Sequence, residues 1–571
     1  MFMNIYYLAT LITEDEITKQ QELIFKIIAN QLHAPQVKRL NGITFQGQPV
    51  YRAKIDKKNR LIFMRIMHGG KPALLILNQN DHNYDELARK LSGANTHKIK
   101  SFHFEAAPSI IIPPQSEERF LPVTVHQEQI FFLDEEQQQA ANCSAPLLMS
   151  GPPGAGKTLV IYDLLHNYLN NSNNLHWVNE ELGHGKKVLF ISQSANLIKK
   201  IQQHYSNEMT SNIPVDFFTL EQILLTEHKG STLLPVDAFS SWLKNVFPQG
   251  DSAVIHYELS LIAALGAEEY LKLGKRECYL SGKTKEQQRV INLLAQWRNH
   301  LKTKHWLDPL TTEITLTNYG AIFCDESQNF SPLTLAALVQ AVRKSKQFFA
   351  CFDDEQAFFS WPYTRGCLLR LLTKQFKDYQ TLHLKKTWRC AARIAEVASH
   401  LLTIKHKLDG NQAKREYNIL ESHLSPDSGL VQIVDSHKLE ALKPRGNLAE
   451  TVIIVLSSAD PEERAKIQLA TGSSNILTPE EAIGLDFNTV ILWKPIATQK
   501  ILHKITAQTN GLNLDEWKLL TKLYVAITRA RQELFIYEPE LTRFKGQLQL
   551  FFGTLQQDKI IPTAALIDEH N

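Results

Sequence analysis

One stretch of the sequence carries residues whose types and spacing suit the binding of phosphate groups. The apolar run Leu147–Met149 leads into the pattern Gly-x-x-x-x-Gly-Lys-Thr, and an apolar-rich helical pattern follows it. Glycines let backbone N–H groups close around phosphate oxygens, and the following helix points its positive end toward them. This strand–loop–helix pattern is the phosphate-binding loop, so it predicts a site for a nucleoside triphosphate. The residues expected to hold the nucleotide are Gly151, Pro152, Pro153, Gly154, Ala155, Gly156, Lys157 and Thr158.

The loop and a later strand end supply the groups that hydrolysis needs. Lys157 is expected to contact the β- and γ-phosphates, and the Thr158 hydroxyl is expected to bind Mg²⁺. Two carboxylates follow the apolar run Ala321–Cys324. Of these, Asp325 suits a metal contact and Glu326 can polarise the attacking water. A phosphate loop combined with a strand that ends in Asp-Glu predicts an ATP hydrolase that uses Mg²⁺.

Further polar groups are placed where they can act on the same nucleotide. Gln356 follows the apolar run 347–352 and can sense the γ-phosphate. Arg389 and Arg529 lie much later in the chain and can neutralise the charge on the transferring phosphoryl group. Gln137 precedes the loop, and its paired donor and acceptor can read the edge of an adenine base.

Two strand ends and one insert are candidates for contact with a nucleic acid. Ser192 and Thr219 follow buried-type strands, and the loops after strand ends line the ligand crevice of a doubly wound sheet. Ordinary strand-end hydroxyls are an equal alternative for both, whereas Trp361 offers a ring for base stacking. The polar insert before residue 315 forms either a strand-binding face or a solvated helical surface. Its basic and aromatic residues are Lys272, Lys275, Arg276, Lys283, Lys285, Arg289, Trp297, Arg298, Lys302, Lys304 and Trp306.

The composition excludes several other classes of protein. The 571 residues predict three or four domains, and 43% hydrophobic with 21% charged residues is typical of a soluble globular chain. The net charge is only +3, so a polyanion would need local basic patches. The six cysteines lack metal-ligand spacing and are expected to be reduced thiols. No signal peptide or membrane span is recognisable, which predicts a cytoplasmic protein without a membrane partner.

Six ordered segments resemble the motifs of superfamily one UvrD/Rep-like helicases: GPPGAGKT, DESQ, FDDEQAFFSW, LKKTWR, TPEEAIGLDF and LYVAITRAR. The preceding LDEEQQQA resembles their adenine-reading Gln motif. The resemblance spans about 440 residues. It implies that Gln137 reads adenine, that Gln356, Arg389 and Arg529 contact the γ-phosphate, and that Trp361 stacks on a base. It further implies a nucleic-acid contact at Thr478 and a loop, Glu481–Asp486, that couples ATP to strand movement.

The same resemblance implies a multidomain α/β fold with two RecA-like parallel-sheet lobes. The first lobe is expected at 127–365, with a helical insert at about 205–315, and the second at 366–571. Only about ninety residues separate the fourth and fifth of these motifs, where full-size relatives insert a large accessory domain. In the coupling motif Glu480 and Ile483 replace the usual His and Lys. Translocation on a single strand is therefore a safer prediction than duplex unwinding.

A separate small domain is expected at residues 1–97. A helical pattern at Leu23–Leu32 precedes three apolar runs, Val50–Ile55, Arg60–Ile66 and Ala73–Leu77, which predict helices followed by an antiparallel meander. Residues 98–126 contain four prolines and no regular period, so they are predicted to be a linker.

The order of elements in this small α+β domain resembles the RelE/ParE toxin fold. The segments L-x-G, Y-R-x-x-I, x-R-L-I-F, H-G-G and H-x-Y-D-x-L carry the resemblance. In that family, basic, His and Tyr residues of the sheet face cleave ribosome-bound mRNA, while ParE relatives act on gyrase. The alternative is a basic-faced module that docks a nucleic acid, the ribosome or a partner. The matching positions are Arg52, Lys54, Arg60, His82 and Tyr84.

The sequence thus leaves three functional hypotheses. The leading one is an ATP-dependent single-stranded DNA translocase or helicase, with 3′–5′ polarity implied by the resemblance and with RNA as a possible track. The second is a RelE-like RNA-cleaving or ribosome-binding effector whose ATPase loads or regulates it. The third is an ATP switch that does not translocate.

Overall fold

The N-terminal part of the chain forms an eight-stranded sheet with short helices. Its elements in the computed structural model are β1 (Ile5–Leu8), α1 (Glu14–Thr18), α2 (Gln21–Ile28), β2 (Val37–Phe45), β3 (Gln48–Lys54), β4 (Arg60–His68), β5 (Lys71–Asn80), α3 (Tyr84–Ser92), β6 (Ile99–Phe102), β7 (Leu121–His126), β8 (Gln129–Phe132) and α4 (Glu135–Ala141). The residues described are 4–28, 36–46, 48–68, 71–92, 94, 99–102, 121–126, 129–170, 187–208, 213–274, 277–316, 319–357, 364–409, 420–440, 442–443, 450–509, 511–556 and 559–561.

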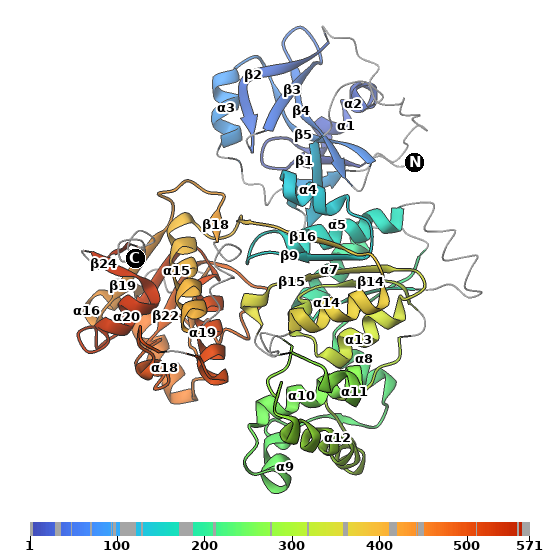
Figure 1. The fold of residues 1–571 in the computed structure, drawn as a ribbon. Coiled ribbons are helices and arrows are strands. Elements are labelled where there is room, and N and C mark those ends of the chain that lie inside the picture. Colours follow the sequence, from blue (N-terminus) through green and yellow to red (C-terminus); the bar gives the residue numbers. More distant parts are fainter. Residues whose placement is uncertain are drawn as a thin grey trace, which may run out of the picture. The chain divides into compact units, whose positions relative to one another are not determined.

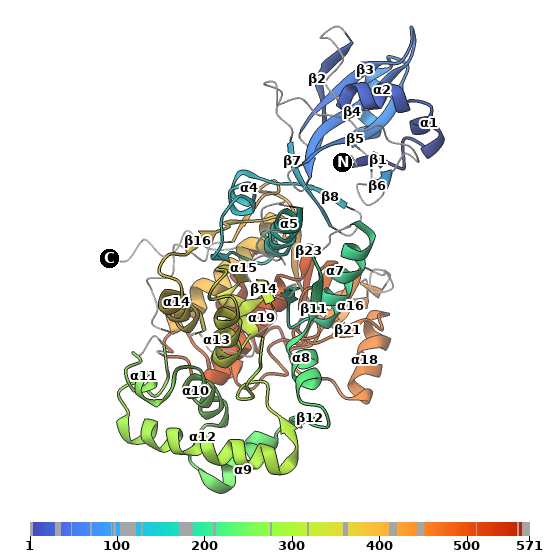
Figure 2. The same ribbon diagram turned by 90° about the vertical axis from the view of Figure 1, so that its right-hand side faces the viewer.

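This sheet has the order β2-β3-β4-β5-β1-β6, with β7 paired to β4 and β8 to β7 (Figures 1 and 2). Strands β3 to β5 form the predicted antiparallel meander, which β2 extends by one antiparallel strand, whereas β1 runs parallel to β5. Apolar residues of α1 and α2 pack on one face of the sheet, and Leu87 and Leu91 of α3 pack on the other. The spacing of Ile24, Ile27 and Ile28 in α2 explains that packing, since positions three and four apart share one side of a helix.

The sequence prediction was incomplete in this part of the chain. It missed β1 and β2 because β1 is only four residues long and β2 buries few of its nine residues. The expectation of a linker without regular structure was wrong at both ends, where β6 and β7 lie. β6 pairs with β1 and β7 with β4, so pairing rather than a local apolar pattern forms these strands.

A second sheet of six strands carries the phosphate loop. All its strands are parallel, in the order β11-β10-β14-β15-β9-β16. This parallel strand order agrees with a RecA-like lobe. Strands of such a sheet are buried on both faces, so they appear in the sequence as continuous apolar runs. The elements of this part are β9 (Leu147–Ser150), α5 (Lys157–Asn170), β10 (Lys187–Ile191), α7 (Ala195–Glu208), β11 (Val215–Phe218), β14 (Tyr319–Cys324), η2 (Ser327–Asn329), α13 (Pro332–Ala341), β15 (Gln347–Phe352), η3 (Asp354–Gln356), α14 (Thr364–Gln375) and β16 (Gln380–His383).

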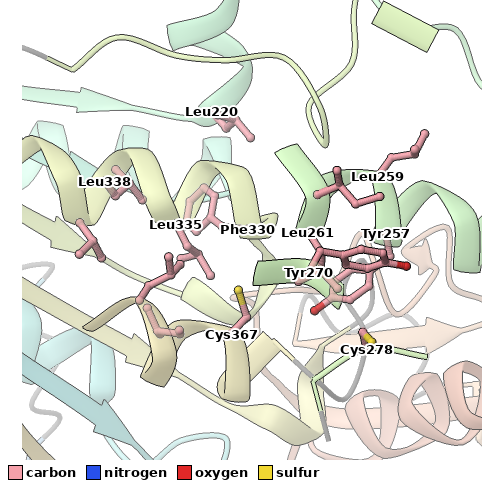
Figure 3. Packing of buried hydrophobic residues seen from close by; sticks show 14 of the residues in the cluster. Leu220, Tyr257, Leu259, Leu261, Tyr270, Cys278, Phe330, Leu335, Leu338 and Cys367 are labelled. Carbon is pink, nitrogen blue, oxygen red and sulfur yellow. The ribbon is translucent and has the colours of Figure 1, made fainter. Parts of the chain in front are cut away.

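The predicted helical insert lies between β11 and β14, so it begins after Phe218 rather than near residue 205. Its core is continuous with that of the six-stranded sheet, because α10 packs against α13 (Figures 2 and 3). Figure 3 shows Leu261 and Leu335 in this shared core. The elements of the insert are α8 (Leu220–Glu227), β12 (Thr232–Leu233), α9 (Ala238–Val246), α10 (Ser252–Leu265), α11 (Ala267–Leu271), α12 (Thr284–Lys304) and β13 (Trp306–Leu307).

One aromatic residue proposed for a strand-binding face of the insert lies inside it instead. Trp297 is fully buried and donates its Nε1–H to Asp308 Oδ2 at 2.8 Å. His256 Nε2 lies 2.8 Å from the same carboxylate oxygen. Trp297 therefore organises the core of the insert and is not available for base stacking.

A third sheet of seven strands follows, in the order β21-β20-β22-β23-β19-β25-β24. Its first five strands are parallel, and helices cover both faces. This largely parallel sheet is consistent with the second RecA-like lobe that is predicted at 366–571. The elements are β17 (Lys386–Thr387), α15 (Ala392–Leu408), β18 (Glu421–Ser422), β19 (Leu430–Val434), α16 (Ser436–Glu440), β20 (Thr451–Ile454), α18 (Pro461–Thr471), β21 (Ile476–Leu477), β22 (Phe487–Trp493), η5 (Leu502–Lys504), α19 (Leu514–Ile527), β23 (Ala530–Tyr537), α20 (Lys545–Phe552), β24 (Thr554–Gln556) and β25 (Lys559–Ile561).

Helix α19 contacts both sheets. It packs against α15 within the seven-stranded part, while its first residue, Leu514, belongs to the hydrophobic core of the six-stranded part. The helix begins with a capping box, in which Asn513 Oδ1 accepts from Glu516 N and Glu516 Oε2 accepts from Asn513 N. Among the described residues, no helix combines the length and the apolar composition that a membrane span requires.

Candidate nucleotide-binding site

The phosphate loop connects β9 to α5 and is packed tightly against the segment that follows β16. Gly154 and Gly156 have φ angles of +74° and +85°, which favour glycine. A Cβ atom at position 154 would lie 2.4 Å from Arg389 Cβ and 2.7 Å from Thr387 Oγ1. The Thr387 hydroxyl donates to Pro153 O at 2.8 Å, and Trp388 N donates to Gly154 O at 2.9 Å. The loop therefore requires glycine at position 154 for close approach as well as for its backbone angle.

The two side chains that end the loop are both engaged. Lys157 Nζ donates to Gly151 O at 2.8 Å and to Pro152 O at 3.0 Å. It also lies 3.8 Å from Asp353 Oδ2. Thr158 Oγ1 donates to Asp325 Oδ2 at 2.8 Å. The structure therefore brings the predicted lysine, threonine and metal-binding aspartate together.

Asp325 and Glu326 follow β14, as the sequence predicts. The buried Asp325 accepts hydrogen bonds from Glu326 N and from the Cys351 thiol in addition to Thr158. Burial, with the neighbouring Glu326 carboxylate as a second cause, raises the pKa of Asp325 to about 6. Glu326 adopts a left-handed backbone conformation with φ of +54°, and its carboxylate accepts a hydrogen bond from Gln328 Nε2.

A chain of hydrogen bonds links the turn after β15 to the residue that follows α19. Gln356 Nε2 donates to Asp353 Oδ2 at 2.7 Å, and Gln356 Oε1 accepts from Arg529 Nη2 at 2.6 Å. Arg529 also donates to the carbonyl oxygens of Val525 and Leu485, at 3.1 and 3.2 Å. Residues 173 positions apart in the sequence thereby meet beside the loop lysine.

Two arginines flank Asp486 beside Arg529. Arg389 Nε lies 3.5 Å and Arg531 Nε 3.9 Å from Asp486 Oδ2. Burial, with the charge of Arg389 as a second cause, lowers the pKa of Arg529 to about 10, so it remains a cation at neutral pH. Since two predicted arginines and the loop lysine converge, the site is suited to a highly charged anion.

The residues present fit Mg²⁺ and a nucleoside triphosphate. A loop that leaves no room for a Cβ atom and is followed by a helix N-terminus suits phosphate oxygens. A hydroxyl and a buried carboxylate within hydrogen-bond distance of each other are the hard oxygen donors that Mg²⁺ prefers.

The other predicted contacts of the motor are placed as follows. Gln137 is buried in α4, where its Oε1 accepts from Asp134 N at 3.1 Å. Ser192 is buried after β10, and the Thr219 hydroxyl caps α8 by accepting from Gln222 N. Thr478 accepts from Glu481 N at 3.3 Å. Contacts of all four with ligands stay predictions, and Trp361 lies outside the described residues.

The residues proposed for the N-terminal domain lie at one end of its sheet. Arg52 on β3 donates to the Tyr84 hydroxyl at 2.7 Å, and His82 Nδ1 lies 3.3 Å from the same oxygen. Lys54 pairs with Arg60 across β3 and β4. Arg60 donates to the carbonyl oxygens of the turn between these strands. Arg52, His82 and Tyr84 therefore meet at the phenol oxygen, whereas Lys54 and Arg60 face each other across the neighbouring strands.

Several contributors to the site were missed in the sequence. Asp353 directly follows the strand β15, and a carboxylate at a strand end was the signal that could have found it. Trp388 is 40% exposed beside the loop, and its ring stacks on His423 with centroids 3.5 Å apart. Glu480, a departure from the family motif, forms an ion pair with Lys522 at 2.5 Å, which no local pattern indicates.

Asp353 gives a prediction about stability. Burial raises its pKa from 3.8 to about 6, so between these values the folded chain holds a proton that the unfolded chain has released. Its contribution to stability therefore falls as pH rises through this window, by about 3 kcal/mol in all for a two-unit shift. We expect Asp353→Asn to raise the melting temperature by several degrees at about pH 7.5 and by less at about pH 5. Thermal unfolding of wild type, Asp353→Asn and the control Asp427→Asn, whose carboxylate is 99% exposed, measures this. An equal shift at both pH values would contradict the assignment.

Comparison with known proteins finds a match in the part of the chain that carries several residues of the candidate site. The UvrD-like helicase C-terminal domain family matches residues 337–539, which include Gln356, Arg389 and Arg529. DNA helicase IV of Escherichia coli (strain K12) is 28% identical over 188 residues, which make up 31% of this chain and 25% of that protein. The chain thus matches about a quarter of the length of this curated relative. The two findings support a UvrD/Rep-like helicase.

Two solved structures show weaker likeness. The PRRSV helicase has a TM-score of 0.28 and 16% identity, over 70% of this chain and 53% of that one. A complex of Arterivirus nonstructural protein 10 (helicase) with DNA has a TM-score of 0.27 and 17% identity, over 72% of this chain and 64% of that one. Scores this low do not establish a common fold. The resemblance of residues 1–97 to RelE/ParE toxins stays a prediction.

Proposed function

We propose that the chain is a nucleic-acid-stimulated ATPase that translocates along single-stranded DNA, with 3′–5′ polarity. The observation that carries the proposal is the hydrogen-bonded chain from Asp353 through Gln356 to Arg529. It joins the turn after one parallel sheet to the helix that leads into the other, beside the phosphate loop. DNA as the track rests on the partial identity to a DNA helicase, and the polarity rests on the motif resemblance alone.

The proposed roles follow the geometry. The loop amides and Lys157 bind the phosphates, and Trp388 offers a ring face beside the loop for the base. Thr158 and Asp325 would hold Mg²⁺, which when bound supplies positive charge against the phosphate oxygens. Glu326 polarises the attacking water.

Coupling to movement is proposed to run through the loop Glu481–Asp486. Arg529 donates to Leu485 O while it holds Gln356, and Asp486 lies between Arg389 and Arg531. A change at the γ-phosphate therefore reaches this loop through direct contacts. A motor of this kind moves by closing and opening two lobes around a strand.

The test is ATP hydrolysis with and without single-stranded DNA and RNA oligomers. We expect strong stimulation by DNA and hydrolysis at background level in Lys157→Ala, which loses the cation that contacts the phosphates. Stimulation by RNA alone would assign RNA instead of DNA as the track. A lack of stimulation by either would favour the ATP switch without translocation.

A second function is favoured by the Arg52–Tyr84–His82 cluster. Because cations, an imidazole and a phenol can bind and cleave a phosphodiester, the N-terminal domain is proposed as an RNA-directed module. RNA binding and RNA cleavage, measured beside DNA-stimulated ATP hydrolysis, test it in a variant that combines Arg52→Ala with His82→Ala. Arg52 is a better choice than Arg60, which supports a turn through its backbone contacts. Loss of RNA binding or cleavage with unchanged DNA-stimulated hydrolysis supports the module, whereas wild-type RNA behaviour contradicts it.

A further inference from the structure

The turn that carries Gln356 is also held on its other side. Asp353 and Gln356 point toward Lys157 and Arg529, whereas Glu355 between them points toward α15. Glu355 Oε2 lies 3.2 Å from Lys405 Nζ, and Glu355 Oε1 lies 2.8 Å from His406 Nε2. The turn at residues 353–356 is thus contacted on two sides by groups from the seven-stranded part of the chain, Arg529 on one side and Lys405 with His406 on the other.

The cation that holds Glu355 is itself enclosed. The Lys405 side chain is 0% exposed and that of Glu355 only 8%. Lys405 Nζ also donates to Thr521 Oγ1 at 2.8 Å and lies 4.0 Å from the centre of the Trp517 ring. Trp517 and Thr521 are one turn apart on α19, the helix that leads directly to Arg529.

A buried ion pair of this kind is weak evidence for stability, because desolvation offsets most of the attraction. The pair does fix the geometry of the turn, because the charge of a buried group is satisfied in only a few arrangements of its partners. α15 and α19 pack against each other (Figure 1). Lys405 on α15 and Arg529 beyond the end of α19 therefore approach the turn from the same pair of packed helices.

We propose that Lys405 and His406 are positioning residues that act through Glu355 to hold Asp353 and Gln356 in register with the nucleotide site. The inference rests on the proposed ATPase function and extends it to the alignment of the turn. Because Lys405 and His406 act through Glu355, their loss is expected to change turnover rather than the binding of ATP.

The test is a double-mutant cycle on the full chain with Lys405→Met and Glu355→Gln. We expect Lys405→Met to lower kcat for DNA-stimulated hydrolysis about 10- to 100-fold, because small misplacements of reacting groups cost that much, with KM for ATP little changed. The kcat of the double variant should be no lower than that of the more impaired single variant, because both substitutions break the same contact. Binding of a fluorescent ATP analogue should be unchanged in all three.

The matched control is Lys466→Met, which breaks a Lys–Glu pair on α18 whose side chains are 62% and 79% exposed. It should leave kcat unaltered. If Lys405→Met does not fold, His406→Leu carries the test, with a smaller loss of kcat expected at unchanged KM.

The outcomes separate the two ideas. Multiplicative losses in the cycle, or a fall in melting temperature with unchanged kcat, would overturn the positioning role alone. A wild-type protein that does not hydrolyse ATP with any nucleic acid would overturn the proposed function and this inference with it.

Discussion

Replacing Arg529 by methionine is expected to lower kcat for ATP hydrolysis about 1,000-fold, the lower end of what an arginine contributes to phosphoryl transfer. The structure gives the reason. Arg529 is buried, remains charged at neutral pH, and holds Gln356 Oε1 at 2.6 Å beside the loop lysine. Steady-state hydrolysis with saturating single-stranded DNA measures the effect.

Two further variants define what is lost. Arg529→Lys keeps the charge but not the planar fork, and should recover only part of the activity. Arg543→Met removes an arginine that is 66% exposed and should behave as wild type. A kcat within threefold of wild type in Arg529→Met, with a folded protein, would remove Arg529 from the site; this margin is about the usual spread of single-contact effects.

The second large effect is expected for Glu326→Gln, which should lower kcat by about 100- to 1,000-fold, the range for a lost general base. Glutamine keeps the size of the side chain and can still bond with Gln328, whose Nε2 donates to Glu326 Oε2. The phosphate loop and Asp325 are untouched, so Mg²⁺ and ATP should still raise the melting temperature of the variant.

Its control is Glu440→Gln, at a side chain that is 79% exposed. Single-turnover hydrolysis together with a thermal shift by ATP separates binding from chemistry. Full hydrolysis in Glu326→Gln would assign the water to another carboxylate, and Asp353 would be the first to examine.

The sequence predicted which residues of the candidate nucleotide site lie together, because the parts of this site are local patterns. A glycine loop and a strand that ends in Asp-Glu each specify their own backbone, so Lys157, Thr158 and Asp325 lie together as expected. Pairings between distant residues could only be inferred from the family resemblance. Arg529 meets Gln356 because two sheets, each built from several crossovers, place α19 beside the turn after β15.

Other features could not be predicted because these residues are buried, and their roles differ from those that the same residue types usually have at the surface. Lys405 and His406 lie in the last turn of α15, where basic residues normally complement the helix end in solvent. Their burial follows from the packing of α19, which no local pattern contains. Trp297 was misread for the same reason, since an aromatic residue among lysines resembles a stacking face until Asp308 is seen to hold its indole. Strands β6 and β7 fail a periodicity test because their partners, β1 and β4, specify them.

Helix α19 has a mechanical consequence for how the six-stranded and seven-stranded parts are joined. Its 14 residues make a rod about 21 Å long at 1.5 Å per residue. Leu514 at its start lies in the core of the six-stranded part, Thr521 at its middle bonds with the lysine that holds Glu355, and Arg529 just beyond its end holds Gln356. A helix held by contacts at three points along its length is not released when the contact at one end breaks. Separation of the two sheets would have to break three contacts near this helix: the packing of Leu514, the Lys405–Glu355 ion pair and the Arg529–Gln356 hydrogen bond.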